Sequence, residues 1–182
     1  MPGKVIRKRR RILIAGEGQG EQALVALLQK LCDQGNRDIH LQFVSSGGGD
    51  SLVVIRACVR TKHRQARTRK PPKNCIALLD YDRLHADRRV GRDAIAEAQR
   101  HQVHTVFIRP NLEGLLLRLH VNQETRKVPA SIAHGELRKL WPEYEKPATA
   151  MELEDRFALN DLKRVAQKDD QVSQLLNLIG LE

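Results

Sequence analysis

Four short apolar segments alternate with longer segments of helical periodicity, and this order constrains the fold more than any other feature of the chain. The apolar segments cover residues 11–16, 39–44, 74–79 and 103–108. Strands that alternate with helices in this way form parallel sheets, because each helix carries the chain back along the sheet in a right-handed crossover. The sequence therefore predicts an α/β, Rossmann-like fold with a parallel sheet of about four strands flanked by helices.

Leucines at helical spacing mark the first helix, and the pattern becomes purely helical after Pro110. The first helix covers residues 20–31, a second runs from residue 51 toward the two prolines at 71 and 72, and a third covers 87–102. The helices expected beyond Pro110 are 112–120, 130–140, 150–166 and 169–178. We therefore expect three regions: a basic N-terminal arm at 1–10, an α/β domain at 11–122, and a helical extension at 123–182 that packs on the same domain.

Acidic residues follow three of the four predicted strands. Glu17 comes directly after the first strand, Asp80 and Asp82 follow the third, and Glu113 lies just beyond the fourth. Because ligands bind at the carboxyl ends of the strands in such sheets, we expect these side chains in one pocket. Carboxylate oxygens are the ligands that Mg²⁺ prefers. The pattern predicts that Asp80, Asp82 and Glu17 bind Mg²⁺, with Mn²⁺ as an alternative, and that Glu113 completes the metal shell.

Each of these acids also has an ordinary structural explanation. Asp80 and Asp82 would serve equally well as helix caps or solvated loop residues, and Glu17 as a solvated residue of the glycine-rich turn 16–20. Glu21 and Glu113 stand where the first turn of a helix favours a negative charge. The glycines of the same turn also suggest a phosphate cradle, which leaves a nucleotide-handling enzyme as an alternative, although the turn lacks the Lys-Ser/Thr of a P-loop.

The chain carries a formal net charge of +10, which favours an acidic partner, and nucleic acid is the commonest one. Eight basic residues lie between Asp50 and Asp80 without a single acid. We expect them to contact phosphates, to bring a nucleic-acid backbone to the strand ends, and to bind less tightly as salt is added. The simpler alternative is a solvated charged face. The eight residues are Arg56, Arg60, Lys62, Arg64, Arg67, Arg69, Lys70 and Lys73.

Four motifs occur in the order found in one family of Toprim-domain proteins. Residues 17–21, Glu-Gly-Gln-Gly-Glu, resemble its EGxxTE motif with glycine in place of threonine, and Asp80-Tyr81-Asp82 matches its DxD motif. Residues 109–117 are similar to its NPxFExWLLLH segment, with the histidine one residue late at His120, and Tyr144-Glu145-Lys146 matches its later YxK. Over most of its length the chain thus resembles the RloB-like branch of the Toprim family.

This resemblance implies a Toprim-like domain at residues 11–122 and a Mg²⁺-dependent nuclease that cleaves DNA or RNA in defence against mobile genetic elements. It implies catalytic roles for Glu17, Glu113 and Lys146, and a companion defence protein as a further partner. Lys146 would neutralise a phosphate, although an exposed charge before Pro147 explains it equally well. A non-catalytic nucleic-acid-binding or assembly subunit that keeps the Toprim shape is the alternative function.

The cysteines and the hydropathy bear on location. Cys32, Cys58 and Cys75 are odd in number and far apart, which favours neither a disulfide framework nor a metal clamp and is typical of a reducing compartment. No segment approaches the roughly 20 apolar residues of a membrane-spanning helix. We therefore expect a cytoplasmic protein with no membrane partner.

Overall fold

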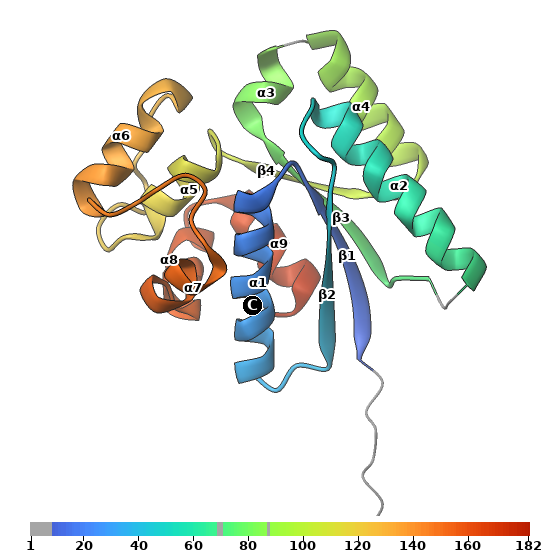
Figure 1. Ribbon diagram of the computed structural model, residues 1–182, viewed down its shortest axis with the longest axis horizontal. Helices are drawn as coiled ribbons and strands as arrows, with labels where there is room; N and C mark the ends of the chain where they lie inside the picture. The colour runs from blue at the N-terminus through green and yellow to red at the C-terminus, as the bar shows by residue number, and fades with distance from the viewer. Residues whose placement is uncertain (1–8, 69–70, 87) are drawn as a thin grey trace, which may run out of the picture.

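A four-stranded parallel sheet forms the centre of the computed structural model, which describes residues 9–68, 71–86 and 88–182 (Figure 1). The strand order is β2-β1-β3-β4, so the first strand lies inside the sheet. This architecture confirms the predicted α/β fold. The strands are β1 (Arg10–Gly16), β2 (Ile39–Ser45), β3 (Asn74–Asp80) and β4 (His104–Ile108).

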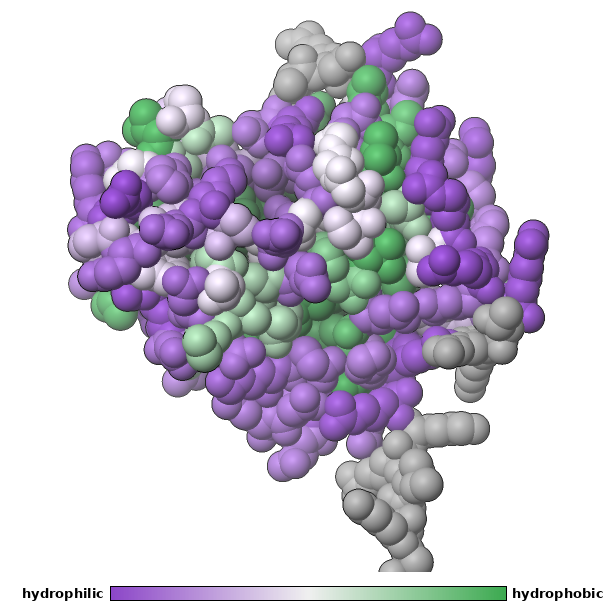
Figure 2. Space-filling view, viewed as in Figure 1, coloured by the Kyte–Doolittle hydropathy of each residue, from purple (hydrophilic) through white to green (hydrophobic). Residues whose placement is uncertain are grey.

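Helices connect the strands and follow the last one. Those between strands are α1 (Gln19–Gln34), α2 (Ser51–Thr68), α3 (Tyr81–Ala86) and α4 (Arg88–Arg100). Those after β4 are α5 (Leu112–Leu119), α6 (Ala130–Leu140), α7 (Ala150–Arg156), α8 (Leu159–Ala166) and α9 (Asp170–Ile179). No helix in the described ranges is both long and apolar enough to cross a membrane. Hydrophilic residues cover most of the face seen in Figure 2.

Helices cover both faces of the sheet, and alternate side chains of β1 pack into the core on each face. Ile12 and Ile14 belong to a core cluster with α1 and the C-terminal helices. Leu13 and Ala15 belong to a second cluster with α2 and α4. Successive side chains of a strand point to opposite faces, so an uninterrupted apolar strand is what a sheet covered on both sides requires. The C-terminal helices therefore share one core with the sheet and α1.

Two helices differ from the sequence expectation. The segment 150–166, expected as one helix, is divided into α7 and α8 because buried Phe157 leaves the helical path. The backbone N–H of Ala158 then donates to Asp161 Oδ2 at 2.7 Å and starts the next helix. The short helix α3 was not predicted, since it begins directly at the end of β3 without a separate capping residue. Of the predicted basic arm, residues 1–8 lie outside the described residues, and Arg9 pairs with Asp33 at 2.9 Å.

The order of the strands creates a switch point between β1 and β3. From β1 the chain moves through α1 to β2 on one side, and then through α2 to β3 on the other side. The connections therefore leave β1 and β3 in opposite directions and on opposite faces. A crevice at the carboxyl ends of these two strands is the usual ligand site of such sheets.

Candidate active site

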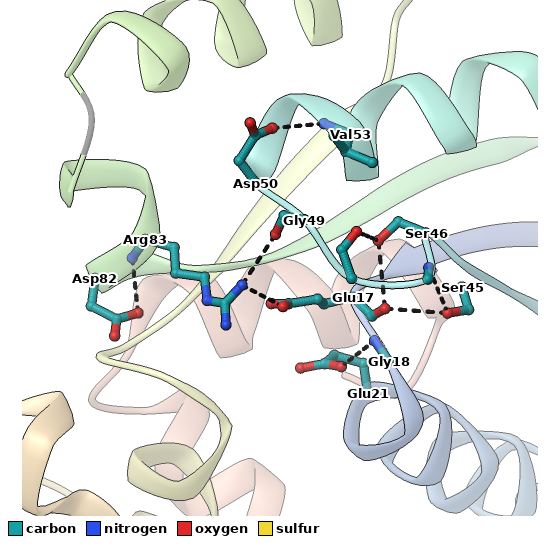
Figure 3. Close-up of polar contacts among 12 residues, drawn as sticks. Glu17, Gly18, Glu21, Ser45, Ser46, Gly49, Asp50, Val53, Asp82 and Arg83 are labelled. Carbon is teal, nitrogen blue, oxygen red and sulfur yellow. Dashed lines mark hydrogen bonds and ion pairs between the residues drawn. The ribbon is translucent and has the colours of Figure 1, made fainter.

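Glu17, in the turn between β1 and α1, and Glu21, in the first turn of α1, both lie at the switch point (Figure 3). Glu17 directly follows β1, and Glu21 Oε2 accepts a hydrogen bond from the backbone N–H of Gly18 at 2.9 Å. A Cβ at Gly16 would lie 2.7 Å from Glu21 Cβ and 2.9 Å from the ring of Phe43. Because glycine carries no Cβ, the helix starts close against the strand and holds the Glu21 carboxylate at the end of the sheet.

Asp80, the last residue of β3, lies beside these glutamates in a concentration of negative charge. Burial raises the pKa of Asp80 to about 8, and four neighbouring carboxylates add to the rise. A desolvated carboxyl among like charges favours its neutral form, which is the physical cause of such a shift. Strongly shifted carboxyls of this kind are typical of functional sites. The four neighbours are Glu21, Asp82, Glu17 and Glu113.

Arg83, in α3, supplies positive charge to the first of these acids. Its Nη1 pairs with Glu17 Oε1 and also donates to the carbonyl of Gly49 at 3.1 Å (Figure 3). Burial nevertheless raises the pKa of Glu17, and this outweighs the lowering by Arg83. The guanidinium also ties the loop after β2 to the turn after β1, since Gly49 belongs to that loop.

Glu113 comes from the C-terminal half of the chain. It lies in the first turn of α5 and is only 3% exposed. Lys146 Nζ pairs with Glu113 Oε1 at 2.7 Å, and the buried Tyr144 hydroxyl donates to the same oxygen at 3.4 Å. Burial and then the Glu113 carboxylate raise the pKa of Tyr144. The segment between α6 and α7 thus brings both ends of the predicted YxK motif onto Glu113.

An open pocket of about 510 Å³, which we call the acidic pocket, is lined by residues from all of these segments. Its lining includes the predicted residues Glu17, Asp80, Glu113 and Lys146, together with Arg83. The sequence therefore predicted most of its charged residues. It missed the part played by Glu21, which lines the pocket and is the largest electrostatic influence on Asp80. The signal for Glu21 was present as the second glutamate of the motif at residues 17–21, but a helix-dipole role explained it equally well.

Asp82 does not line this pocket. Asp82 is the second residue of α3, where its N–H donates to the carbonyl of Pro110 at 3.1 Å and its Oδ1 accepts from the N–H of Arg83 at 2.9 Å. In Figure 3 the side chain of Arg83 lies between the carboxylates of Asp82 and Glu17. Within the described ranges, no group of three or more Asp, Glu, His or Cys side chains is arranged to hold a metal ion. The metal role of Asp80, Asp82 and Glu17 stays a prediction.

The basic residues of α2 lie away from this pocket. The helix begins with Ser51, which lines a smaller neighbouring pocket that shares Glu17 and Asp80 with this one. It then runs back along the sheet for 18 residues, about 27 Å. Lys62 Nζ donates to the carbonyl of His101 at 2.6 Å and so fixes the end of α4. The expectation that this helix brings nucleic acid to the strand ends stays a prediction. A crossover helix of this kind runs from the carboxyl end of one strand back to the start of the next. The exposed members on α2 are Arg56, Arg60, Arg64 and Arg67, and Lys73 is exposed just before β3. Arg69 and Lys70 lie outside the described residues.

The comparisons with known proteins add no assignment. No protein-family model, curated protein or solved structure matches the chain. The resemblance to RloB-like Toprim proteins therefore stays a prediction from the motifs. The acidic pocket and the residues that line it are the basis for any functional conclusion.

Proposed function

We propose that the chain is a Toprim-type nuclease that uses Mg²⁺ or Mn²⁺ to cleave phosphodiester bonds in DNA or RNA, and that it serves in defence against mobile genetic elements. The observation that carries this proposal is the carboxylate cluster around Asp80 at the carboxyl ends of β1 and β3. Burying like charges together costs free energy, so a cluster of this kind is typically kept only where a function requires it. The order of the four motifs supports the same reading.

The donor chemistry of the pocket fits a divalent cation. Asp80, Glu17 and Glu21 offer carboxylate oxygens, which are the hard ligands that Mg²⁺ and Mn²⁺ take. The raised pKa of Asp80 indicates an excess of negative charge, which a bound cation would relieve. Asp80 with Glu17 and Glu21 would hold the ion. Asp82, which Arg83 separates from Glu17 in Figure 3, remains a predicted ligand of the ion.

The remaining residues suit the handling of a phosphodiester. When bound, a divalent ion supplies Lewis acidity and an activated water for attack on phosphorus. Lys146 holds its ammonium group at Glu113 with 63% of its side chain exposed, so it is able to meet a phosphate oxygen entering the pocket. Glu113 and Tyr144 position that lysine from the buried side. Glu17 is the candidate general acid or base, since burial raises its pKa toward neutrality.

Cleavage of assorted DNA and RNA substrates with Mg²⁺ or Mn²⁺ tests the proposal. Asp80→Asn and Glu17→Gln should each reduce the cleavage rate by about 100-fold or more, because each removes a charge from the reacting centre. Asp93→Asn is the matched control, since Asp93 is exposed on α4 away from the pocket, and it should cleave as the wild type does. Equal rates for wild type and Asp80→Asn would contradict the assignment. Binding without cleavage under either metal would indicate the non-catalytic alternative.

A further inference from the structure

A second pocket lies at the carboxyl end of β4, and the function proposed above does not use it. Its volume is about 760 Å³ and it is open to solvent. Tyr81 and Arg109, which follow β3 and β4, form one side, and the segment between α5 and α6 together with the turn before α9 forms the rest. A pocket of this volume is within the range that binds ligands. We call it the basic pocket, after the five cations that line it: Arg109, Arg118, Arg126, Lys127 and Lys168.

Two carboxylates also line the basic pocket, and each is already neutralised by the protein. Asp169 accepts from Arg118 Nη1 at 2.5 Å, and both side chains are at least nine-tenths buried. Glu124 pairs with Arg164 Nε at 2.7 Å. Arg118 Nη2 also donates to the carbonyl of Arg109 at 3.0 Å, so the buried Arg118–Asp169 pair connects the segment after β4 to the turn before α9. The acids therefore do not compete for the remaining cations.

Lys127 and Lys168 provide the charge that remains. Arg109 pairs with Asp170 at 2.8 Å, and Arg126 pairs with Glu136. Lys127 and Lys168, by contrast, are exposed and make no ion pair or hydrogen bond with another side chain in the described ranges. Because the three arginines of the pocket are each paired with a carboxylate, these two uncompensated ammonium groups give it a net positive charge, which favours an anionic ligand.

The basic pocket and the acidic pocket flank the same piece of chain. Asp80 lines the acidic pocket and Tyr81 lines the basic one, and their Cα atoms are about 3.8 Å apart. The hydrogen bond from Asp82 N–H to the Pro110 carbonyl, at 3.1 Å, holds the ends of β3 and β4 together at this point. The two pockets therefore lie on either side of the end of β3, close enough for one extended polyanion to contact both.

We propose that the basic pocket binds the phosphodiester backbone of the nucleic acid next to the bond that is cleaved, with Lys127 and Lys168 contacting phosphates. The inference rests on the function proposed above and names the part of the surface that holds its substrate. Nucleic acid then reaches the acidic pocket from the C-terminal helices, because the cations of α2 run back from the carboxyl edge of the sheet. Backbone phosphates are common to DNA and RNA, so the pocket contributes affinity for both.

The salt dependence of binding tests this role. A labelled single-stranded DNA and an RNA of the same sequence are titrated with protein over a range of salt concentrations in EDTA, so that binding is measured without cleavage. Each phosphate contact contributes about 0.7 to the slope of log K against log salt for single strands. The Lys127→Gln/Lys168→Gln double variant should therefore bind more weakly and lower the slope by about 1.4 for both strands. The Lys127→Arg/Lys168→Arg variant should keep the slope.

The matched control removes two charges from the opposite edge of the sheet instead. Arg10 begins β1 and Arg37 precedes β2, both are exposed and neither lines the acidic or the basic pocket, so an Arg10→Gln/Arg37→Gln variant should leave the slope unchanged. An unchanged slope in the lysine variant, or an equal fall in both double variants, would overturn the role of the basic pocket. Thermal unfolding of each variant shows that it is folded. If the wild type binds as expected but never cleaves, the nuclease proposal fails while the binding role of the pocket stands.

Discussion

The charge on Asp80 is linked to folding because its environment differs so strongly between the folded and unfolded chain. Its pKa rises from the ordinary value of 3.8 to about 8 in the folded protein, chiefly through burial. Between these two pH values the folded state keeps a proton that the unfolded state has lost. The stability contributed by Asp80 is therefore present below pH 4, falls as the pH rises toward 8, and is constant above that.

Replacing Asp80 by asparagine should remove this pH dependence. In EDTA, Asp80→Asn should be more stable than the wild type at pH 8 by on the order of 2 kcal/mol, and this advantage should shrink at pH 5. Thermal or urea unfolding at the two pH values measures the difference. Asp93→Asn, which removes an exposed carboxylate, should show no such trend. A stability difference that does not change with pH would show that the pKa of Asp80 is the same in the folded and unfolded chain, and would contradict the prediction.

The residues of the site differ in how well the sequence predicted them. Glu17 and Asp80 were predictable because each follows an apolar run, and parallel strands end at one edge. Glu113 was predicted in the same way from its place beyond the fourth strand, whereas Lys146 was linked to the site by the motif order alone. The position of Asp82 depends on a helix that begins one residue earlier, and nothing in the local sequence fixes where that turn directs its side chain.

At the scale of whole elements, strands were easier to predict than the helices around them. Each strand is a short apolar run bounded by polar residues, and each of its ends differs from the expectation by one residue at most. Helices α7 and α8 looked like one helix because their helical periodicity continues across the break at Phe157. The basic stretch of α2 was read correctly as a helix, but its direction relative to the sheet follows from the crossover and decides which edge its cations reach.

Two helical glycines give opposite predictions for the same substitution. In α5, a Cβ at Gly114 would lie 2.3 Å from Cδ of Pro110, a ring atom that cannot rotate away. Gly114→Ala should therefore destabilise the protein by about 1–3 kcal/mol and displace Glu113 in the same turn. In α6, a Cβ at Gly135 would meet nothing within 4 Å, so Gly135→Ala should stabilise by about 0.5–1 kcal/mol through helix propensity.

Urea unfolding of both glycine variants measures these changes. Gly135→Ala is the matched control for Gly114→Ala, because both replace a glycine inside a helix and differ in the space available. Nuclease activity adds a second readout, which should fall for Gly114→Ala alone. Stabilisation of both variants would mean that Pro110 moves aside at little cost, and that α5 is not held tightly at its first turn.

For the molecule as a whole, the two layers of helices depend on one sheet. α2 and α4 cover one face, while α1 and the C-terminal helices cover the other (Figure 1). Residues 123–182 have no separate core among the described clusters, since their buried side chains join those of α1 and β1. The chain should therefore unfold as one cooperative unit, although its sequence pattern changes from mixed to purely helical after residue 110.

The single tryptophan makes this cooperativity measurable. Trp141 is buried among the C-terminal helices, whereas Ile55 is fully buried on α2 across the sheet. Ile55→Ala should cost about 2–5 kcal/mol and shift the unfolding curve followed by Trp141 fluorescence as far as the curve followed by circular dichroism. Met151→Ala, which truncates a 69% exposed side chain on α7, should shift neither curve. If Ile55→Ala did not shift the unfolding curve followed by Trp141 fluorescence, the C-terminal helices would fold independently of the layer formed by α2 and α4.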